Sequence, residues 1–217
     1  MQDQSGNIQL ILGPMFSGKS SELIKLIRRY NIKKHKTVVI KFNLDDRYET
    51  GQTNVISHDK VTYPAIKCGR LSEVKDILLK HEVIGIDEGQ FFPDLAEVCE
   101  ELANNGKHIV IAALNANFKR ESFPAIASLF PKCEKIINLQ SICYYCNDDA
   151  PFTLRTVGGE DEIVIGGLEM YKPVCRLCYN IKSDPEQRNT REEVKSDSSK
   201  EIDEVVEVEE LISGISV

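Results

Sequence analysis

The residues best suited to chemistry lie in Gly13–Ser20, whose sequence GPMFSGKS matches the phosphate-binding pattern G-x-x-x-x-G-K-S. Glycines in such a loop let backbone N–H groups converge on phosphate oxygens, and the helix that follows adds partial positive charge. Lys19 is expected to reach the β- and γ-phosphates, and the Ser20 hydroxyl is expected to bind Mg²⁺. The predicted phosphate-binding residues are Gly13, Pro14, Met15, Phe16, Ser17, Gly18, Lys19 and Ser20.

Two adjacent carboxylates, Asp87 and Glu88, lie at the end of the predicted strand Val83–Asp87, as carboxylates do at the end of a Walker B strand. Asp87 is expected to hold Mg²⁺ directly or through water. Glu88 is the candidate general base, because it can take a proton from an acceptor hydroxyl in a kinase or from water in a hydrolase. These residues alone leave both reactions open.

A third group consists of two CxxC pairs, separated by the 28 residues 147–174: Cys143, Cys146, Cys175 and Cys178. Four thiolates suit a tetrahedral structural Zn²⁺ with no open position for catalysis. The gap exceeds the roughly 15–20 residues of common zinc ribbons, so a long loop is expected between the pairs. The other three cysteines are interpreted as small core or surface residues: Cys68, Cys99 and Cys133.

The elements that must position these groups alternate between strand and helix. The strand pattern of Ile8–Leu12 precedes the phosphate loop, and the amphipathic segment Ser20–Tyr30 follows it. Thr37–Phe42 is β-branched, and His108–Leu114 is apolar enough for the centre of a parallel sheet. Lys135–Leu139 is a predicted edge strand. The pattern predicts an α/β fold, a P-loop NTPase-like parallel sheet flanked by helices, with a small zinc-binding lobe.

One further helix is marked at both ends. Asp94 and Glu97 have the spacing of an N-terminal capping box, and Gly106 is the predicted stop. Its predicted buried stripe is Leu95, Val98 and Leu102.

Charge and composition divide the 217 residues into three regions: a P-loop domain over 1–141, a zinc-binding lobe over 142–182, and an acidic tail over 183–217 that is expected to be disordered. The tail holds 11 acidic and 4 basic residues and so carries the whole net charge of −7. The remaining residues sum to zero, which disfavours nucleic acid or an anionic membrane as a partner by bulk charge. With neither a membrane-length apolar run nor a secretory signal in the sequence, a cytoplasmic location with reduced or metal-bound cysteines is expected.

Beyond these patterns, the chain resembles the type II thymidine kinases, the family of the vertebrate cytosolic, many bacterial and poxviral enzymes. The matching segments are Gly13–Ser20 with Met15 inside it, Asp45–Tyr48, Ser57–Asp59, Gly85–Phe92 (GIDEGQFF), the paired CxxC, and Tyr171 four residues before Cys175. The resemblance implies ATP- and Mg²⁺-dependent phosphorylation of the thymidine 5′-hydroxyl to give dTMP, a structural Zn²⁺, a homotetramer and feedback inhibition by dTTP.

The resemblance also implies roles for individual residues. Glu88 matches the catalytic base, and Lys19, Ser20 and Asp87 match the phosphate and Mg²⁺ residues. Further residues implied to bind ATP are Arg47, Asp87, Glu88, Gly89 and Gln90. The implied thymidine pocket contains Met15, Phe91, Leu114, Phe118, Thr153 and Tyr171, together with a lasso loop formed by Glu162, Ile163, Val164, Ile165 and Gly166. Asn115 stands where the family often has Asp, and the acidic tail has no assigned counterpart.

Two other readings of the sequence stay open. A P-loop ATPase whose zinc ribbon binds nucleic acid would also account for the phosphate loop and the cysteines. The basic residues Arg28, Arg29, Lys33, Lys34 and Lys36 could suggest a nucleic-acid face or a nuclear signal, although we interpret them as a solvated helix face. A catalytically inactive zinc scaffold is the third reading, and the intact Lys19, Asp87 and Glu88 argue against it.

Overall fold

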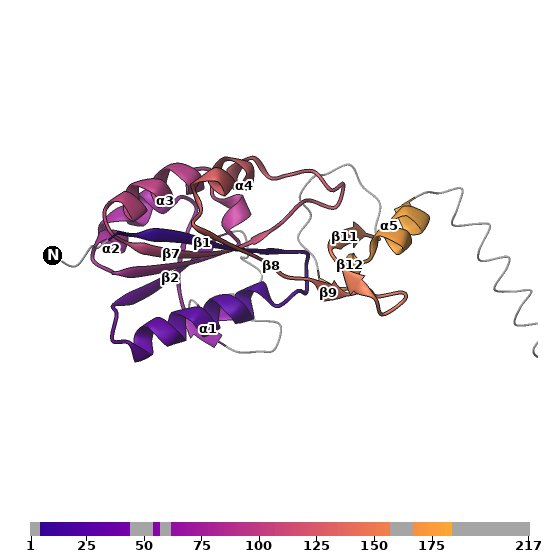
Figure 1. Cartoon of the computed structure of the whole chain (residues 1–217), viewed down its shortest axis with the longest axis horizontal. Coiled ribbons are helices and arrows are strands. Elements are labelled where there is room, and N and C mark those ends of the chain that lie inside the picture. The colour runs from indigo at the N-terminus through magenta and orange to yellow at the C-terminus, as the bar shows by residue number, and fades with distance from the viewer. Residues whose placement is uncertain (1–4, 44–53, 57–61, 157–166, 184–217) are drawn as a thin grey trace, which may run out of the picture. The chain divides into compact units, whose positions relative to one another are not determined.

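Six strands pair in parallel to form the central sheet of the computed structural model (Figure 1). In order across the sheet they are β5 (Ile66–Cys68), β2 (Thr37–Phe42), β6 (Val83–Asp87), β7 (His108–Leu114), β1 (Asn7–Gly13) and β8 (Lys135–Asn138). The interior strands are runs of apolar, mostly β-branched residues, as a sheet covered on both faces requires. The predicted ranges of β2, β6 and β7 are confirmed to the residue, and β8 lies at the edge as expected.

The structure describes residues 5–43, 54–56, 62–156 and 167–183. The chain divides into two compact units, Met1–Cys175 and Arg176–Val217. In the described part of the second unit the chain forms helix α5 (Arg176–Ser183). The three regions expected from the sequence, 1–141, 142–182 and 183–217, stay a prediction.

Helices cover both faces of the sheet in the first unit. Figure 1 shows α1 (Lys19–Ile32) on one face, and α3 (Leu95–Asn104) and α4 (Pro124–Leu129) on the other. The sheet accordingly packs into two apolar clusters. One joins it to the buried face of α1, Leu23, Ile24, Leu26 and Ile27, and the other joins it to the predicted stripe of α3, Leu95, Val98 and Leu102. The α/β fold predicted from the sequence is confirmed, and this two-sided burial anchors the strands whose ends carry the candidate site.

The shorter elements of the first unit connect these layers or lie after the sheet. The connecting pieces are α2 (Lys75–Leu79) and the 3₁₀ turns η2 (Leu71–Val74), η3 (Gly89–Phe91) and η4 (Phe130–Lys132). Three two-stranded antiparallel sheets pair β3 (Asn54–Ile56) with β4 (Thr62–Pro64), β9 (Ser141–Ile142) with β10 (Asp149–Ala150), and β11 (Phe152–Arg155) with β12 (Tyr171–Val174).

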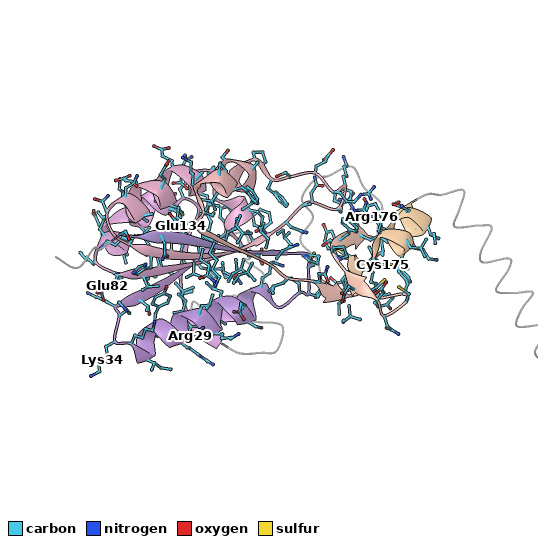
Figure 2. The ribbon with its side chains drawn as sticks, in the orientation of Figure 1. Arg29, Lys34, Glu82, Glu134, Cys175 and Arg176 are labelled. Carbon is cyan, nitrogen blue, oxygen red and sulfur yellow. The ribbon has the colours of Figure 1, made fainter. Side chains whose placement is uncertain are left out.

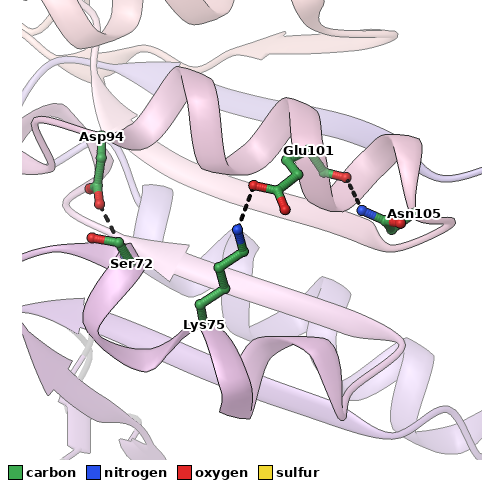
Figure 3. A network of polar contacts seen from close by, with 5 residues as sticks. All are labelled: Ser72, Lys75, Asp94, Glu101 and Asn105. Atoms are coloured by element: carbon green, nitrogen blue, oxygen red, sulfur yellow. Dashed lines mark hydrogen bonds and ion pairs between the residues drawn. The ribbon is translucent and has the colours of Figure 1, made fainter.

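The predicted capping box of α3 is wrong. Asp94 occupies the N-cap position, but its side chain makes no capping bond to α3. Its two carboxylate oxygens instead accept the backbone N–H groups of Leu71 at 3.1 Å and of Ser72 at 3.0 Å. Figure 3 shows the contact of Asp94 with Ser72. These donors belong to the start of η2, where no intrahelical partner exists, so Asp94 caps a neighbouring turn. The predicted stop is confirmed, because α3 ends at Asn104 and Gly106 N–H bonds to the Ala103 carbonyl.

The basic residues around the end of α1 are exposed: Arg28, Arg29, Lys33, Lys34 and Lys36. Figure 2 labels Arg29 and Lys34 on this part of the chain, together with Glu82, the residue before β6, whose carboxylate accepts the backbone N–H of Lys36 at 2.8 Å. Within the described ranges, we find no helix with both the length and the apolar character that a membrane crossing demands.

Candidate active site

The phosphate loop between β1 and α1 is closely packed. A Cβ on Gly13 would lie 2.5 Å from Ser17 Oγ and 2.8 Å from the Leu139 carbonyl oxygen, so only glycine fits. Ser17 Oγ and Lys19 Nζ both donate to the Pro14 carbonyl, at 2.9 and 2.6 Å. Lys19 is therefore folded onto the loop that it is predicted to serve. Burial lowers the pKa of the Lys19 ammonium, while the carboxylates of Glu88 and Asp87 act in the opposite direction.

The phosphate loop meets the Asp87–Glu88 pair through a side-chain hydrogen bond. Ser20 Oγ, on the first turn of α1, donates to Asp87 Oδ1 at 2.9 Å. Asp87 is only 4% exposed. Burial and the neighbouring Glu88 raise the pKa of Asp87, and Ser20, Lys41 and Lys19 partly offset that rise. A half-buried hydroxyl and a buried carboxylate at this separation form an oxygen donor set of the kind that Mg²⁺ prefers.

Lys41 is a cation near this pair that the sequence analysis did not select. It is the register partner of Asp87 in the parallel pairing of β2 with β6. The position of Lys41 depends on strand register, which the sequence alone does not supply. Its positive charge reduces the cost of keeping the buried Asp87 carboxylate ionised.

Glu88 has an unusual backbone conformation. Its φ of 57° and ψ of 41° place it in the left-handed region, which costs a non-glycine residue about 1–2 kcal/mol. Its carboxylate accepts a hydrogen bond from Gln90 Nε2 at 2.6 Å, and Gln90 Oε1 accepts the backbone N–H of Leu114 at 3.0 Å. Such strain is characteristic of functional positions. The turn aims Glu88 away from the direction in which β6 would have continued.

The phosphate loop is also joined to β11. Met15 N–H donates to Thr153 Oγ1 at 3.0 Å, although the two residues are 138 positions apart. Asn115 Nδ2 donates to the Pro151 carbonyl at 3.1 Å. Three predicted pocket residues, Met15, Leu114 and Thr153, therefore belong to one connected region.

Aromatic residues of the predicted thymidine pocket make further contacts. The Arg155 guanidinium lies 4.1 Å from the centroid of the Phe118 ring, within the range of a cation–π contact. Arg155 is 9% exposed and is the cross-strand partner of Tyr171. Arg155 thus links two residues of the predicted thymidine pocket, Phe118 and Tyr171. Phe91 belongs to a separate aromatic cluster, with ring centroids 5.7 Å from Phe42 and 6.2 Å from Phe123.

The loop in which Asn115 replaces a frequent Asp has a complete polar network. Asn117 is 8% exposed, and its Oδ1 accepts the backbone N–H groups of Lys119 and Glu121, each at 2.9 Å. Asn117 Nδ2 donates to Glu121 Oε2 at 3.0 Å. An Asn that bonds the backbone two residues ahead is a recognised turn former, so the sequence carried a signal for this clamp. The clamp fixes the loop that presents Phe118.

Several predicted positions lie outside the described residues. They are Arg47 and the rest of Asp45–Tyr48, Ser57–Asp59, the lasso residues Glu162, Ile163, Val164, Ile165 and Gly166, and the tail from 184 onward.

The four CxxC cysteines come together. The sulfur atoms of Cys143, Cys146, Cys175 and Cys178 all lie within 4.8 Å of one another. Burial acts to raise the pKa of Cys143, but backbone N–H groups of Cys175, Tyr145 and Cys146 outweigh it and lower the pKa to about 6. A thiol that ionises this readily is suited to a metal. The group therefore fits the tetrahedral Zn²⁺ site expected from the sequence.

The remaining cysteines behave differently. Burial raises the pKa of Cys68 and of Cys133 to about 11 each, and it raises the pKa of the fully buried Cys99 as well. They are therefore apolar packing residues, two of them buried.

Comparisons with known proteins place this site in context. The model of the family "Thymidine kinase" matches residues 6–179. The thymidine kinase of variola virus is 47% identical over 175 residues, which cover 80% of this chain and 97% of that protein. Those of raccoon poxvirus and vaccinia virus (strain Ankara) are each 48% identical with the same coverage. Among solved structures, the Legionella pneumophila ATPase DotB aligns with a TM-score of 0.38 and 14% identity, covering 64% of this chain and 42% of DotB. A structural similarity this low has no bearing on function.

Proposed function

Because the chain belongs to the thymidine kinase family, we propose that it transfers the γ-phosphoryl group of ATP to the 5′-hydroxyl of thymidine and releases dTMP and ADP. The observation that supports the catalytic part most directly is the hydrogen bond between Ser20 and Asp87. It joins the phosphate loop to a strand end whose next residue is Glu88, so phosphate-binding groups and a carboxylate base share one site.

On the phosphate side, we assign the triphosphate to the loop Gly13–Ser20 and to the ammonium of Lys19. Lys19 must leave the Pro14 carbonyl to reach the phosphates, which exchanges one hydrogen bond for charge-assisted ones. Ser20 and Asp87 would hold Mg²⁺, which neutralises charge on the β- and γ-phosphate oxygens when bound. A nearby cation favours the ionised carboxylate, so metal binding would reverse the upward shift in the pKa of Asp87.

On the acceptor side, we assign the general base to Glu88. Its carboxylate would accept the proton of the 5′-hydroxyl while the bond from O5′ to the γ-phosphorus forms. The bond from that phosphorus to the oxygen of the β-phosphate breaks, and its electron pair leaves with ADP. The left-handed backbone at Glu88 and the electrostatic interaction of its carboxylate with Asp87 and Lys19 support this assignment.

We assign the nucleoside to the pocket formed by Met15, Phe91, Leu114, Phe118, Thr153 and Tyr171, completed by the loop 162–166. The contact of Met15 with Thr153 supports this assignment, because it brings β11 to the phosphate loop. An apolar wall would accept the 5-methyl group, and main-chain groups would read the pyrimidine edge. Arg47 and Gly89 complete the proposed ATP-binding set, whereas Gln90, for which the family resemblance implies an ATP contact, bonds Glu88 instead.

We assign a structural Zn²⁺ to Cys143, Cys146, Cys175 and Cys178. The ion would supply no catalytic step, since four thiolates leave no open coordination position. These cysteines flank the segment that contains β11 and β12, so the metal would stabilise the strands that carry Thr153 and Tyr171.

The assembly and regulation implied by the family are part of the proposal. We expect a homotetramer, inhibition by dTTP and a cytoplasmic location, with no nucleic acid or membrane partner. Size-exclusion chromatography with light scattering, followed by turnover assays with added dTTP, tests the first two.

The proposed reaction is tested by incubating the zinc-loaded protein with ATP, Mg²⁺ and each of the four deoxynucleosides. The expected result is one ADP and one dTMP per turnover with thymidine, measured by chromatography. If the folded protein forms no thymidine monophosphate, the proposed reaction is wrong. ATP hydrolysis that is stimulated by DNA and independent of any nucleoside would instead support the ATPase reading.

A further inference from the structure

The carboxylate of Glu88 is held by a side chain to which the reaction above gives no step. Gln90 Nε2 donates to Glu88 Oε2, and Gln90 Oε1 accepts from Leu114 N–H at the end of β7. A backbone N–H can only donate, so the amide oxygen must face Leu114 and the NH₂ group must face Glu88. The end of β7 therefore determines which way the Gln90 amide points.

The turn that carries these residues is pinned to the sheet. A Cβ on Gly89 would lie 2.6 Å from Ile111 Cγ2, so η3 rests directly on β7. Phe91 N–H donates to the Glu88 carbonyl at 3.1 Å, and Gln90 is only 5% exposed. Because both ends of the buried Gln90 amide are hydrogen-bonded, its side chain has little conformational freedom. The Glu88 carboxylate that it bonds is restricted in the same way.

We propose that Gln90 is a positioning residue for Glu88, fixing the orientation of its carboxylate for proton transfer through the link to Leu114. This inference rests on the proposed function, because it takes Glu88 as the base. Gln90 engages Oε2, which leaves Oε1 as the oxygen that receives the 5′-hydroxyl proton. This role differs from the ATP contact implied for Gln90 by the family resemblance.

The test is a double-mutant cycle between Gln90→Met and Glu88→Gln, measured as kcat and as KM for ATP and thymidine. Gln90→Met removes both hydrogen bonds at similar volume. Gln90→Glu keeps the acceptor for Leu114 N–H but loses the donor to Glu88, so it preserves the turn if the Met variant folds poorly. Gln9→Met, in the middle of β1, is the matched control. Circular dichroism and Tm confirm folding of each variant.

We expect both Gln90 variants to lower kcat about 10- to 100-fold, the cost of a misplaced catalytic group. Both KM values should stay within about threefold, and Gln9→Met should have near-normal kcat. In the Glu88→Gln background, Gln90→Met should lower kcat no further, because the group it positions is gone.

Three results would overturn the positioning role. They are a rise in the KM for ATP with kcat unchanged, an equal loss of kcat with and without Glu88, and wild-type turnover in both Gln90 variants. The proposed function fails separately: no dTMP from the unmodified protein refutes the reaction, and wild-type turnover of Glu88→Gln refutes the base and the positioning role together.

Discussion

Replacement of Asp94 should destabilise the protein in a way that depends on pH. Its two carboxylate oxygens accept the backbone N–H groups of Leu71 and Ser72, and Asp94 is 8% exposed. Asp94→Ala leaves both donors at the start of η2 without an acceptor. Asp94→Asn keeps one carbonyl oxygen, so it can satisfy one of them.

The magnitude follows from these two bonds. A hydrogen bond to a charged group contributes about 1.5–3 kcal/mol, and the partial exposure of Ser72 favours the low end. We therefore expect Asp94→Ala to lower the free energy of unfolding by about 2–4 kcal/mol and Asp94→Asn by about half as much. For a chain of this size, the loss in Asp94→Ala corresponds to roughly 5–15 °C in Tm.

The pH dependence has a definite sign. Burial acts to raise the pKa of Asp94, but the hydrogen bonds from Ser72 and Leu71 outweigh it and hold the pKa below its usual value. A lowered pKa in the folded state contributes stability above the unfolded pKa of about 3.9, and this contribution is lost as pH falls through the folded pKa. The difference between wild type and Asp94→Asn should therefore be constant from pH 8 to 5 and shrink below about pH 4.

Urea denaturation at a series of pH values measures both effects, with the exposed Asp76→Asn on the adjacent α2 as the control. Asp76→Asn should change the free energy of unfolding by less than about 0.5 kcal/mol. Equal stability of the two Asn variants, or a difference from wild type that is the same at pH 3.5 as at pH 7, would refute the reasoning.

Three further predictions concern the site itself. Gly13→Ala should raise the KM for ATP at least tenfold and lower Tm by roughly 2–10 °C, because its Cβ would lie 2.8 Å from the Leu139 carbonyl oxygen; an unchanged KM would contradict the packing argument. Removing metal with a strong chelator, or replacing Cys143 in Cys143→Ser, should abolish a one-to-one zinc content and lower Tm by roughly 5 °C or more. Metal analysis and calorimetry measure the two effects, and an unchanged Tm in the metal-free protein would contradict a structural role for zinc. Arg155→Met should raise the KM for thymidine several-fold while leaving that for ATP near normal, since the guanidinium supports Phe118; equal changes in the two would point to general disruption instead.

The strands of the sheet could be predicted because buried parallel strands have sequences that are short apolar runs. Thr37–Phe42, Val83–Asp87 and His108–Leu114 each stand out from polar flanks, and their observed bounds agree with the prediction. The phosphate loop and the strand that ends in carboxylates could also be predicted, because both are local sequence patterns.

What the sequence could not supply depends on contacts between distant residues. Asp94 had the spacing of a capping box, yet a competing pair of N–H donors more than twenty residues earlier takes its carboxylate. The partner of Gln90 and the contact of Met15 with Thr153 likewise come from strand order and loop packing. Hydrophobic periodicity predicts individual helices and strands, but it does not predict which residues of different elements contact one another.

The position of β7 between β6 and β1 has a consequence for the order of folding during synthesis. The strand that leads into the phosphate loop is made first, and the strand that ends in Asp87 follows, but neither pairs with the other. Each pairs with β7, so the main-chain hydrogen bonds of the sheet cannot join them before His108–Leu114 has left the ribosome. In a nascent chain that stops before this segment, the phosphate loop and the Asp87–Glu88 pair would not yet be joined by the sheet. Emergence of β7 is then the event that brings the site together, and the slow step expected for such long-range parallel pairing falls at that point.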